Sequence, residues 1–151
     1  MSVDKFAVAR AGLAEFERSL RTSDFFAEDF VWDFSEMEGW IEDSEYHGRA
    51  EFDAQMERWT EPFESWSWEL SELIDAGGDD ILAVGVQRGV LKGSGTPVAM
   101  PIAQIWTVGD GKLRRIRMFL EPAHAHRAAG LTAASEQQSA ALGRTDASAE
   151  R

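Results

Sequence analysis

Residues 81–121 read ILAVGVQRGVLKGSGTPVAMPIAQIWTVGDGKLRRIRMFLE, and this stretch decides the fold. Apolar residues alternate within it, as side chains of a β-strand do when they point to opposite faces of a sheet. Two glycine-containing segments, at 93–95 and 109–111, interrupt the alternation. Glycine adopts the positive φ angles of tight turns at little cost. The pattern therefore predicts three consecutive antiparallel strands, at 81–92, 98–108 and 113–120.

Two polar side chains interrupt the apolar faces of these strands. Arg88 shares a face with Leu82 and Val84 in the first strand, and Gln104 shares a face with Trp106 in the second. A buried polar group costs free energy unless it finds a hydrogen-bond partner. Three interpretations remain open: each group is satisfied structurally, the register is shifted by one residue, or both side chains face a ligand cavity.

The remaining chain supplies helices, further strands and a tail. The predicted elements are helices at 3–20, 48–60 and 122–130, strands at 29–35 and 66–74, and an aromatic loop at 36–47. After residue 131 the sequence is small, polar and alanine-rich, with little that could offset the entropy of ordering. We therefore expect one domain at 1–131 and a disordered tail at 132–151.

Composition excludes several classes of protein. The chain of 151 residues has no cysteine and a net charge of −12, which argues against a disulfide framework and against binding nucleic acid. No apolar run approaches the ~20 residues of a membrane span, and the N-terminus lacks the apolar core of a secretory signal. We expect a cytoplasmic protein that contacts neither membrane nor nucleic acid.

Five stretches carry a resemblance to a known family. They are FAEDFVWDF (26–34), YHGRAEFDAQMERW (46–59), GSGTPV (93–98), AQIWTVGDGKLRRIRMFLE (103–121) and AHAHRAAGL (123–131). With the order of elements, they resemble the SnoaL-like branch of the nuclear-transport-factor-2-like superfamily. The resemblance implies a cone-shaped α+β barrel, in which a strongly curved, mostly antiparallel sheet has helices closing its concave face over a pocket. It does not define an activity, because members include polyketide cyclases, ketosteroid isomerases, epoxide hydrolases, dehydratases and proteins without catalysis.

Three positions of the family's active sites can be placed on this chain. By resemblance, Asp33 lies close to the general base of the ketosteroid isomerases, with a spacing that differs by one residue. Gln104 falls where those isomerases have an acidic oxyanion-binding residue and where the polyketide cyclases have a histidine. Met118 falls where the cyclases have an aspartate, and a methionine cannot transfer protons. The arginine-bridged carboxylate pair of the epoxide hydrolases is not evident on these strands.

Other residues are candidates by chemistry or position. His47 precedes a helix and has an unperturbed pKa near neutrality, so it either acts in acid–base catalysis or hydrogen-bonds a loop. His124 and His126 are two residues apart on a helix and do not share a face, so we expect no metal site, and no motif indicates a cofactor. The residues predicted to bind a ligand, beside the catalytic candidates Asp33, Gln104 and His47, are Trp32, Trp40, Tyr46, Trp59, Arg88, Trp106, Ile116 and Met118.

Two functions remain open. The first is proton transfer of the isomerase, cyclase or dehydratase type on an apolar cyclic carbonyl compound, with Asp33 as base and Gln104 as an oxyanion donor. The second is a non-catalytic protein that binds a small apolar molecule in the same pocket. Either protein is expected to form a homodimer through the convex face of the sheet, where Ile105 and Phe119 would otherwise expose apolar area.

Overall fold

The computed structural model describes residues 4–37 and 44–130. Along these residues the chain forms α1 (Lys5–Ser19), β1 (Phe26–Asp33), β2 (Glu45–His47), α2 (Gly48–Thr60), β3 (Phe63–Asp75), β4 (Asp80–Leu91), β5 (Pro97–Gly109), β6 (Lys112–Phe119) and α3 (Pro122–Ala128). Each predicted strand and helix is found within a few residues of its expected bounds. The predicted loop at 36–47 ends in strand β2, because its last residues pair with the end of β1.

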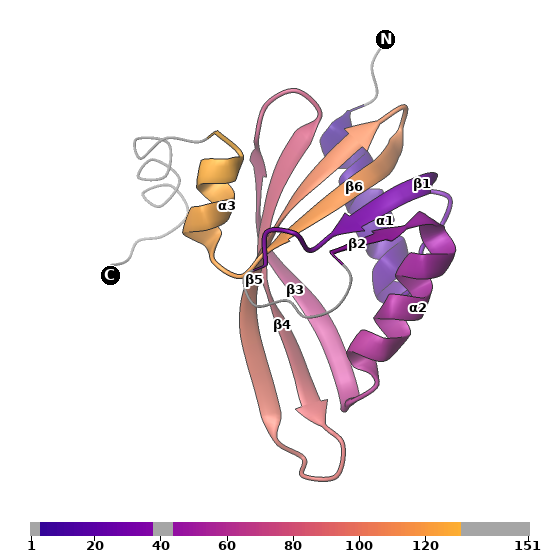
Figure 1. Ribbon diagram of the computed structural model, residues 1–151, viewed down its shortest axis with the longest axis vertical. Coiled ribbons are helices and arrows are strands. Elements are labelled where there is room, and N and C mark those ends of the chain that lie inside the picture. The colour runs from indigo at the N-terminus through magenta and orange to yellow at the C-terminus, as the bar shows by residue number, and fades with distance from the viewer. Residues whose placement is uncertain (1–3, 38–43, 131–151) are drawn as a thin grey trace.

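The strands form one six-stranded sheet in the order β2-β1-β6-β5-β4-β3. All neighbours are antiparallel except β1 and β6, which run parallel. The sheet curves strongly without closing, so β2 and β3 remain as its two edges (Figure 1). This arrangement confirms the predicted cone-shaped α+β fold, as a mostly antiparallel sheet that stays open.

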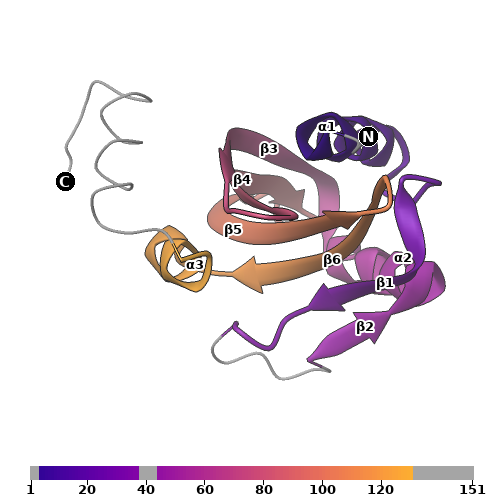
Figure 2. The same cartoon turned by 90° about the horizontal axis from the view of Figure 1, so that it is seen from above.

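Helices α1 and α2 cover the concave face of the sheet, and α3 lies on the opposite side (Figure 2). Phe52 of α2 is central to the concave core, where its ring packs 4.4 Å from Trp32, centroid to centroid, and edge-on to Phe30. Helix α1 buries Ala9 and Phe16 against the same cluster. The two helices therefore close the concave side with aromatic rings, which bury more apolar area than other side chains do.

A second, smaller core lies on the opposite face beneath α3. Ile105 and Phe119 are fully buried there, together with Ala125 of the helix. The apolar area that suggested a dimer interface is thus covered within the chain itself. The homodimer stays a prediction, and the expected tail at 132–151 lies outside the described residues.

In the described part of the chain, no helix is both long and apolar enough to cross a membrane.

Candidate functional site

A cavity lies between the concave face of the sheet and helices α1 and α2. Its lining consists of Leu13, Phe16, Phe26, Trp32, Phe52, Met56, Trp59, Trp66, Trp68, Gln87, Ile102, Gln104, Trp106, Leu113, Ile116 and Met118. The volume of the cavity is ≈ 70 Å³. A ligand of more than a few atoms therefore has to part some side chains, and the flexible Met56 and Met118 can move most easily.

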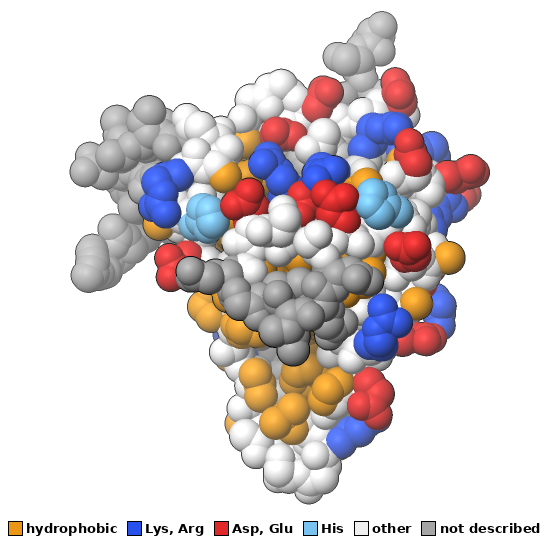
Figure 3. Space-filling view, in the orientation of Figure 1, with side chains coloured by type: hydrophobic (Ala, Val, Ile, Leu, Met, Phe, Trp, Pro, Cys, Tyr) orange, Lys and Arg blue, Asp and Glu red, His pale blue; other side chains and the backbone are white. Residues whose placement is uncertain are grey.

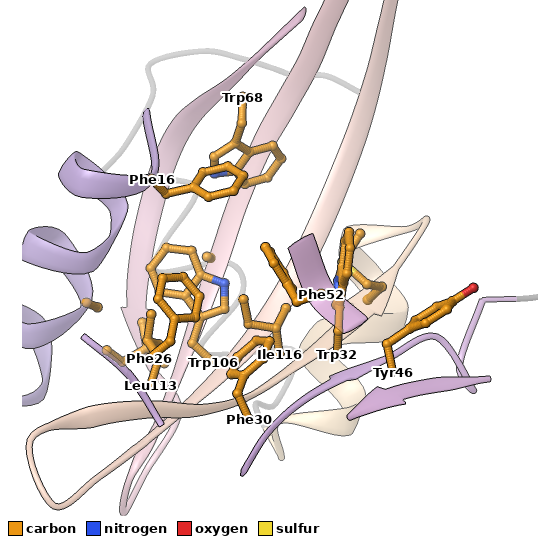
Figure 4. Close-up of a cluster of buried hydrophobic side chains, with 14 of the residues drawn as sticks. Phe16, Phe26, Phe30, Trp32, Tyr46, Phe52, Trp68, Trp106, Leu113 and Ile116 are labelled. Carbon is orange, nitrogen blue, oxygen red and sulfur yellow. The ribbon is translucent and has the colours of Figure 1, made fainter. Parts of the chain in front are cut away.

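Aromatic rings form most of the cavity wall. Phe16 and Trp68 contribute to one part of this wall, and Phe26, Trp106 and Leu113 contribute to another (Figure 4). Trp68 can lie this close to the sheet because residue 85 is a glycine. A Cβ atom at Gly85 would come within 2.9 Å of the Trp68 ring.

Strand β4 turns Gln87 toward the cavity, so the prediction that Arg88 faces it is wrong. Ala83 pairs with Gln104 of β5, and Gln87 lies four residues along β4 on the same face. Arg88 is exposed on the opposite face, where its Nε donates to Glu69 at 2.8 Å. The alternation misled because both faces of β4 are buried near its start, one beneath α1 and α2 and the other beneath α3.

Two glutamine side chains, Gln87 and Gln104, line the cavity. The Oε1 of Gln87 accepts hydrogen bonds from Trp59 Nε1 and Trp66 Nε1, both at 2.8 Å. The Oε1 of Gln104 accepts from Trp106 Nε1 at 2.6 Å, and its Nε2 lies 3.2 Å from the sulfur of Met118. An indole N–H only donates, so these contacts fix which end of each amide is oxygen.

Two further indole nitrogens in the lining have no acceptor. The Nε1 atoms of Trp32 and Trp68 are buried, and no hydrogen-bond partner for either lies within the described residues. A buried donor without a partner costs about 1–3 kcal/mol, and native proteins rarely leave one unsatisfied without a reason. The polar groups of the cavity thus consist mainly of donors.

Ionisable side chains are absent from the described lining of the cavity. Asp33, the expected base, points to the opposite face of β1, because its neighbour Trp32 points inward. Its carboxylate accepts from Arg115 at 2.5 Å and from the backbone N–H of Ser35 at 2.8 Å. The assignment of Asp33 as a base in the cavity therefore loses its geometric support.

Arg115 joins three strands on that opposite face. Its guanidinium contacts Asp33 of β1 and, at 3.1 Å, Glu45 of β2. Burial of Asp33 opposes its ionisation, but hydrogen bonds from Ser35 and Arg115 and the charge of Arg115 outweigh that effect and lower the pKa of the carboxyl. An arginine-bridged carboxylate pair, which the sequence did not reveal, thus exists on the face away from the cavity. Acidic and basic side chains gather together over β1 and β2 in Figure 3.

The other predicted site residues divide between cavity and surface. Trp32, Trp59, Trp106, Ile116 and Met118 line the cavity with Gln104, as expected.

Tyr46 is buried behind Trp32 and packs against Phe34, and it does not reach the lining. His47 is exposed, with its Nε2 3.1 Å from Glu45 and its backbone N–H donating to Glu51 at the start of α2. Trp40 lies outside the described residues. Within residues 4–37 and 44–130, no cluster of His, Asp or Glu could hold a metal ion.

Gln87, Trp66 and Trp68 are cavity residues that the sequence did not single out. The sequence contained enough information to place Gln87. Antiparallel pairing of the predicted strands at 81–92 and 98–108 puts it on the same face as Gln104. Trp66 and Trp68 pack in the core and form part of the cavity wall.

Comparison with known proteins agrees with this fold. The family model for the SnoaL-like domain matches residues 9–116, so the chain belongs to the SnoaL-like family. A search of curated protein sequences finds no match.

Several solved structures share this fold at low sequence identity. The structure of TerC co-crystallised with polyporic acid is 18% identical, with a TM-score of 0.64, and the match covers 83% of this chain and 98% of that one. An NTF2-like protein from Burkholderia thailandensis is 19% identical, with a TM-score of 0.65 and coverage of 84% and 98%. A proposed polyketide cyclase from Xanthomonas campestris is 20% identical, with a TM-score of 0.57 and coverage of 80% and 92%. At these identities the likeness establishes the fold alone.

Proposed function

We propose that this SnoaL-like chain binds an uncharged, largely apolar small molecule in the concave cavity and does not catalyse proton transfer. The observation that carries the proposal is the absence of any ionisable side chain from the described lining. General acid–base catalysis needs a proton donor or acceptor within hydrogen-bond reach of the reacting atom. Gln104 and Met118, at positions where relatives are expected to carry acids or bases, cannot fill that role here.

The chemistry of the lining supports a neutral ligand. A buried ion without a counter-charge is costly, and no described lining residue would neutralise one. Flat apolar molecules gain instead from burial against the rings of residues such as Trp106 and Phe26. TerC, which shares the fold, was crystallised with polyporic acid, and this supports a small organic molecule as the kind of occupant.

The test is to identify the ligand that the protein binds and to determine whether the protein changes it chemically. Native mass spectrometry of the full chain, purified from the cells that produce it, is expected to show a bound neutral molecule that returns unchanged after incubation. A product of different mass or isomeric form would contradict the non-catalytic proposal.

A pair of variants on β5 localises the binding. Ile102→Phe enlarges a buried lining residue and is expected to weaken binding about tenfold, because it fills the space the ligand needs. Ala99→Phe, on the same strand at an exposed position outside the concave cavity, is expected to bind as the wild type. Equal binding by both variants would place the ligand elsewhere.

A further inference from the structure

Gln87 stands out among the cavity residues because its amide is held in one orientation. Both hydrogen bonds to its Oε1 come from indole N–H groups, one from Trp59 of α2 and one from Trp66 of β3. Indole nitrogens cannot accept a hydrogen bond, so turning the amide over would replace two hydrogen bonds with two donor–donor contacts. The Oε1 of Gln87 is thereby saturated, and its Nε2 has to face another way.

The Nε2 of Gln87 faces the cavity without a partner. The side chain is 4% exposed and lines the cavity, and Nε2 makes no hydrogen bond within the described residues. Unlike the indole nitrogens of Trp32 and Trp68, Nε2 is not sealed from open space. The open space that it reaches is therefore the cavity, and a ligand there meets an N–H₂ group already aimed at it.

The other polar groups of the cavity have the same character. Gln104 gives its oxygen to Trp106, which leaves its Nε2 with only the weak acceptor sulfur of Met118. The Nε1 atoms of Trp32 and Trp68 also lack acceptors, although both are sealed from the open space of the cavity. Against these donors, the side chains of the described lining offer little more than one remaining lone pair, on Gln104 Oε1. A ligand that matches this cavity has to bring acceptor oxygens and few or no donors.

We infer that Gln87 is the specificity-determining hydrogen-bond donor of the cavity, and that its ligand is a neutral, largely aromatic molecule that bears an acceptor oxygen such as a carbonyl. This inference rests on the proposed ligand binding and adds the class of ligand. A site whose buried donors await an acceptor rejects the analogue that lacks one, because the donors would stay unpaired in the complex. Preference for a carbonyl over the matching hydrocarbon is thus the property that Gln87 confers.

The test compares 1-indanone with indane, two bicyclic molecules of nearly the same shape that differ by one carbonyl oxygen. Both are titrated into the full chain, and binding is followed by the amide resonances of Gln87 and the indole N–H resonances in nuclear magnetic resonance spectra. The wild type is expected to bind 1-indanone at least about tenfold more tightly than indane, with the Gln87 N–H₂ resonances shifting only for the ketone. Equal affinities would overturn the donor inference while leaving the binding proposal intact. No resonance shift with either molecule would contradict the binding proposal itself.

Variants at position 87 identify the donor. Gln87→Glu, studied at pH 8, keeps an oxygen for the indoles of Trp59 and Trp66 and removes the N–H₂ group, so the preference for 1-indanone is expected to disappear. Gln87→Met is a neutral variant of similar size that also loses the preference, and it provides the test if the buried carboxylate prevents folding.

Gln55→Glu is the matched control. Gln55 is buried on α2, accepts from Arg58 and does not line the cavity, so this variant is expected to keep the wild-type preference. A tenfold preference that survives in both Gln87 variants would overturn the assignment of Gln87.

Discussion

The two faces of strands β1 and β6 carry opposite chemistry, although the residues concerned are neighbours in sequence. Trp32 and Ile116 pair with one another and face the cavity, which has no described ionisable group. Asp33 and Arg115, one residue away on each strand, form an ion pair on the other face, in which Asp33 is buried and Arg115 is partly exposed. Charge is thus retained where the protein supplies its own counter-charge, and the cavity is left neutral. Substitutions at Asp33 or Arg115 are therefore expected to change stability, and substitutions at Trp32 or Ile116 are expected to change ligand binding.

The largest effect is expected from Arg115→Ala. Asp33 is 3% exposed, so removing its cation leaves a nearly buried carboxylate unpaired. Loss of one partner of a buried pair costs 3–5 kcal/mol, and the partial exposure of Arg115 reduces this to about 2–3 kcal/mol. Urea unfolding measures the loss, and affinity for 1-indanone is expected to stay unchanged.

Arg114→Ala provides the control for that variant. Arg114 pairs with the exposed carboxylate of Asp29, and exposed pairs contribute about 0–1 kcal/mol. Equal destabilisation by the two alanine variants would contradict a special role for the bridge made by Arg115.

The next effect is expected on the cavity side, from Gly85→Ala. The added Cβ would lie 2.4 Å from the carbonyl oxygen of Glu69 and 2.9 Å from the Trp68 ring, so strand or ring has to shift. Overpacking of this kind costs about 1–3 kcal/mol. Thermal unfolding measures the destabilisation, and a displaced Trp68 should also weaken ligand binding. Val84→Ile, at a half-buried position on the other face, is expected to leave binding intact.

Lowering the pH is expected to weaken the ion pair between Asp33 and Arg115 and so to destabilise the folded chain. The pKa of Asp33 is lowered in the folded chain, so its contribution to stability is complete above the ordinary value of 3.8 and is lost as the pH falls through the lower folded value. The free energy of unfolding is therefore expected to decrease from pH 5 downward. Asp33→Asn should show a shallower decrease.

The exposed pair of Asp75 with Lys5 also lowers a carboxyl pKa and contributes to the same acid slope. The variant Asp75→Asn removes the contribution of Asp75, so its unfolding free energy in acid shows how much of the decrease is due to that pair. If the unfolding free energy of Asp33→Asn decreased with falling pH as steeply as that of the wild type, the ion pair of Asp33 with Arg115 would not cause the acid sensitivity.

The smallest effect, close to zero, is expected for the pH dependence of binding. Because the described lining has no ionisable group, affinity for 1-indanone should be constant between about pH 6 and 9. Calorimetric titration across this range checks it. A sigmoidal change in affinity would reveal a titrating group at the site and favour the proton-transfer function.

The sequence predicted the elements better than the site. Alternation placed Gln104, Trp106 and Met118 correctly, because most of the large apolar side chains of β5 and β6 lie on that face, although Ile105 and Phe119 are buried on the other. It failed for Arg88 because the start of β4 is buried on both faces, so alternation there gives no inward direction.

The orientation of Asp33 and the locked amide of Gln87 depend on contacts between distant parts of the chain. The bond from Arg115 to Asp33 spans 82 residues, and Gln87 is held by residues 28 and 21 positions away. No periodicity encodes such meetings, and they emerge only once the sheet curves and α2 crosses it.

The path of α2 also limits how far the molecule can open. Strands β2 and β3 are the two edges of the sheet, yet α2 is nearly all the chain that separates them. A helix of 13 residues is about 20 Å long. It therefore holds the end of β2 and the start of β3 about that far apart. We therefore expect a ligand to enter by rotation of side chains at the mouth rather than by separation of the two edges. Lengthening α2 by one turn would widen the gap by about 5 Å, which makes this helix the natural place to change the size of molecule that the fold accepts.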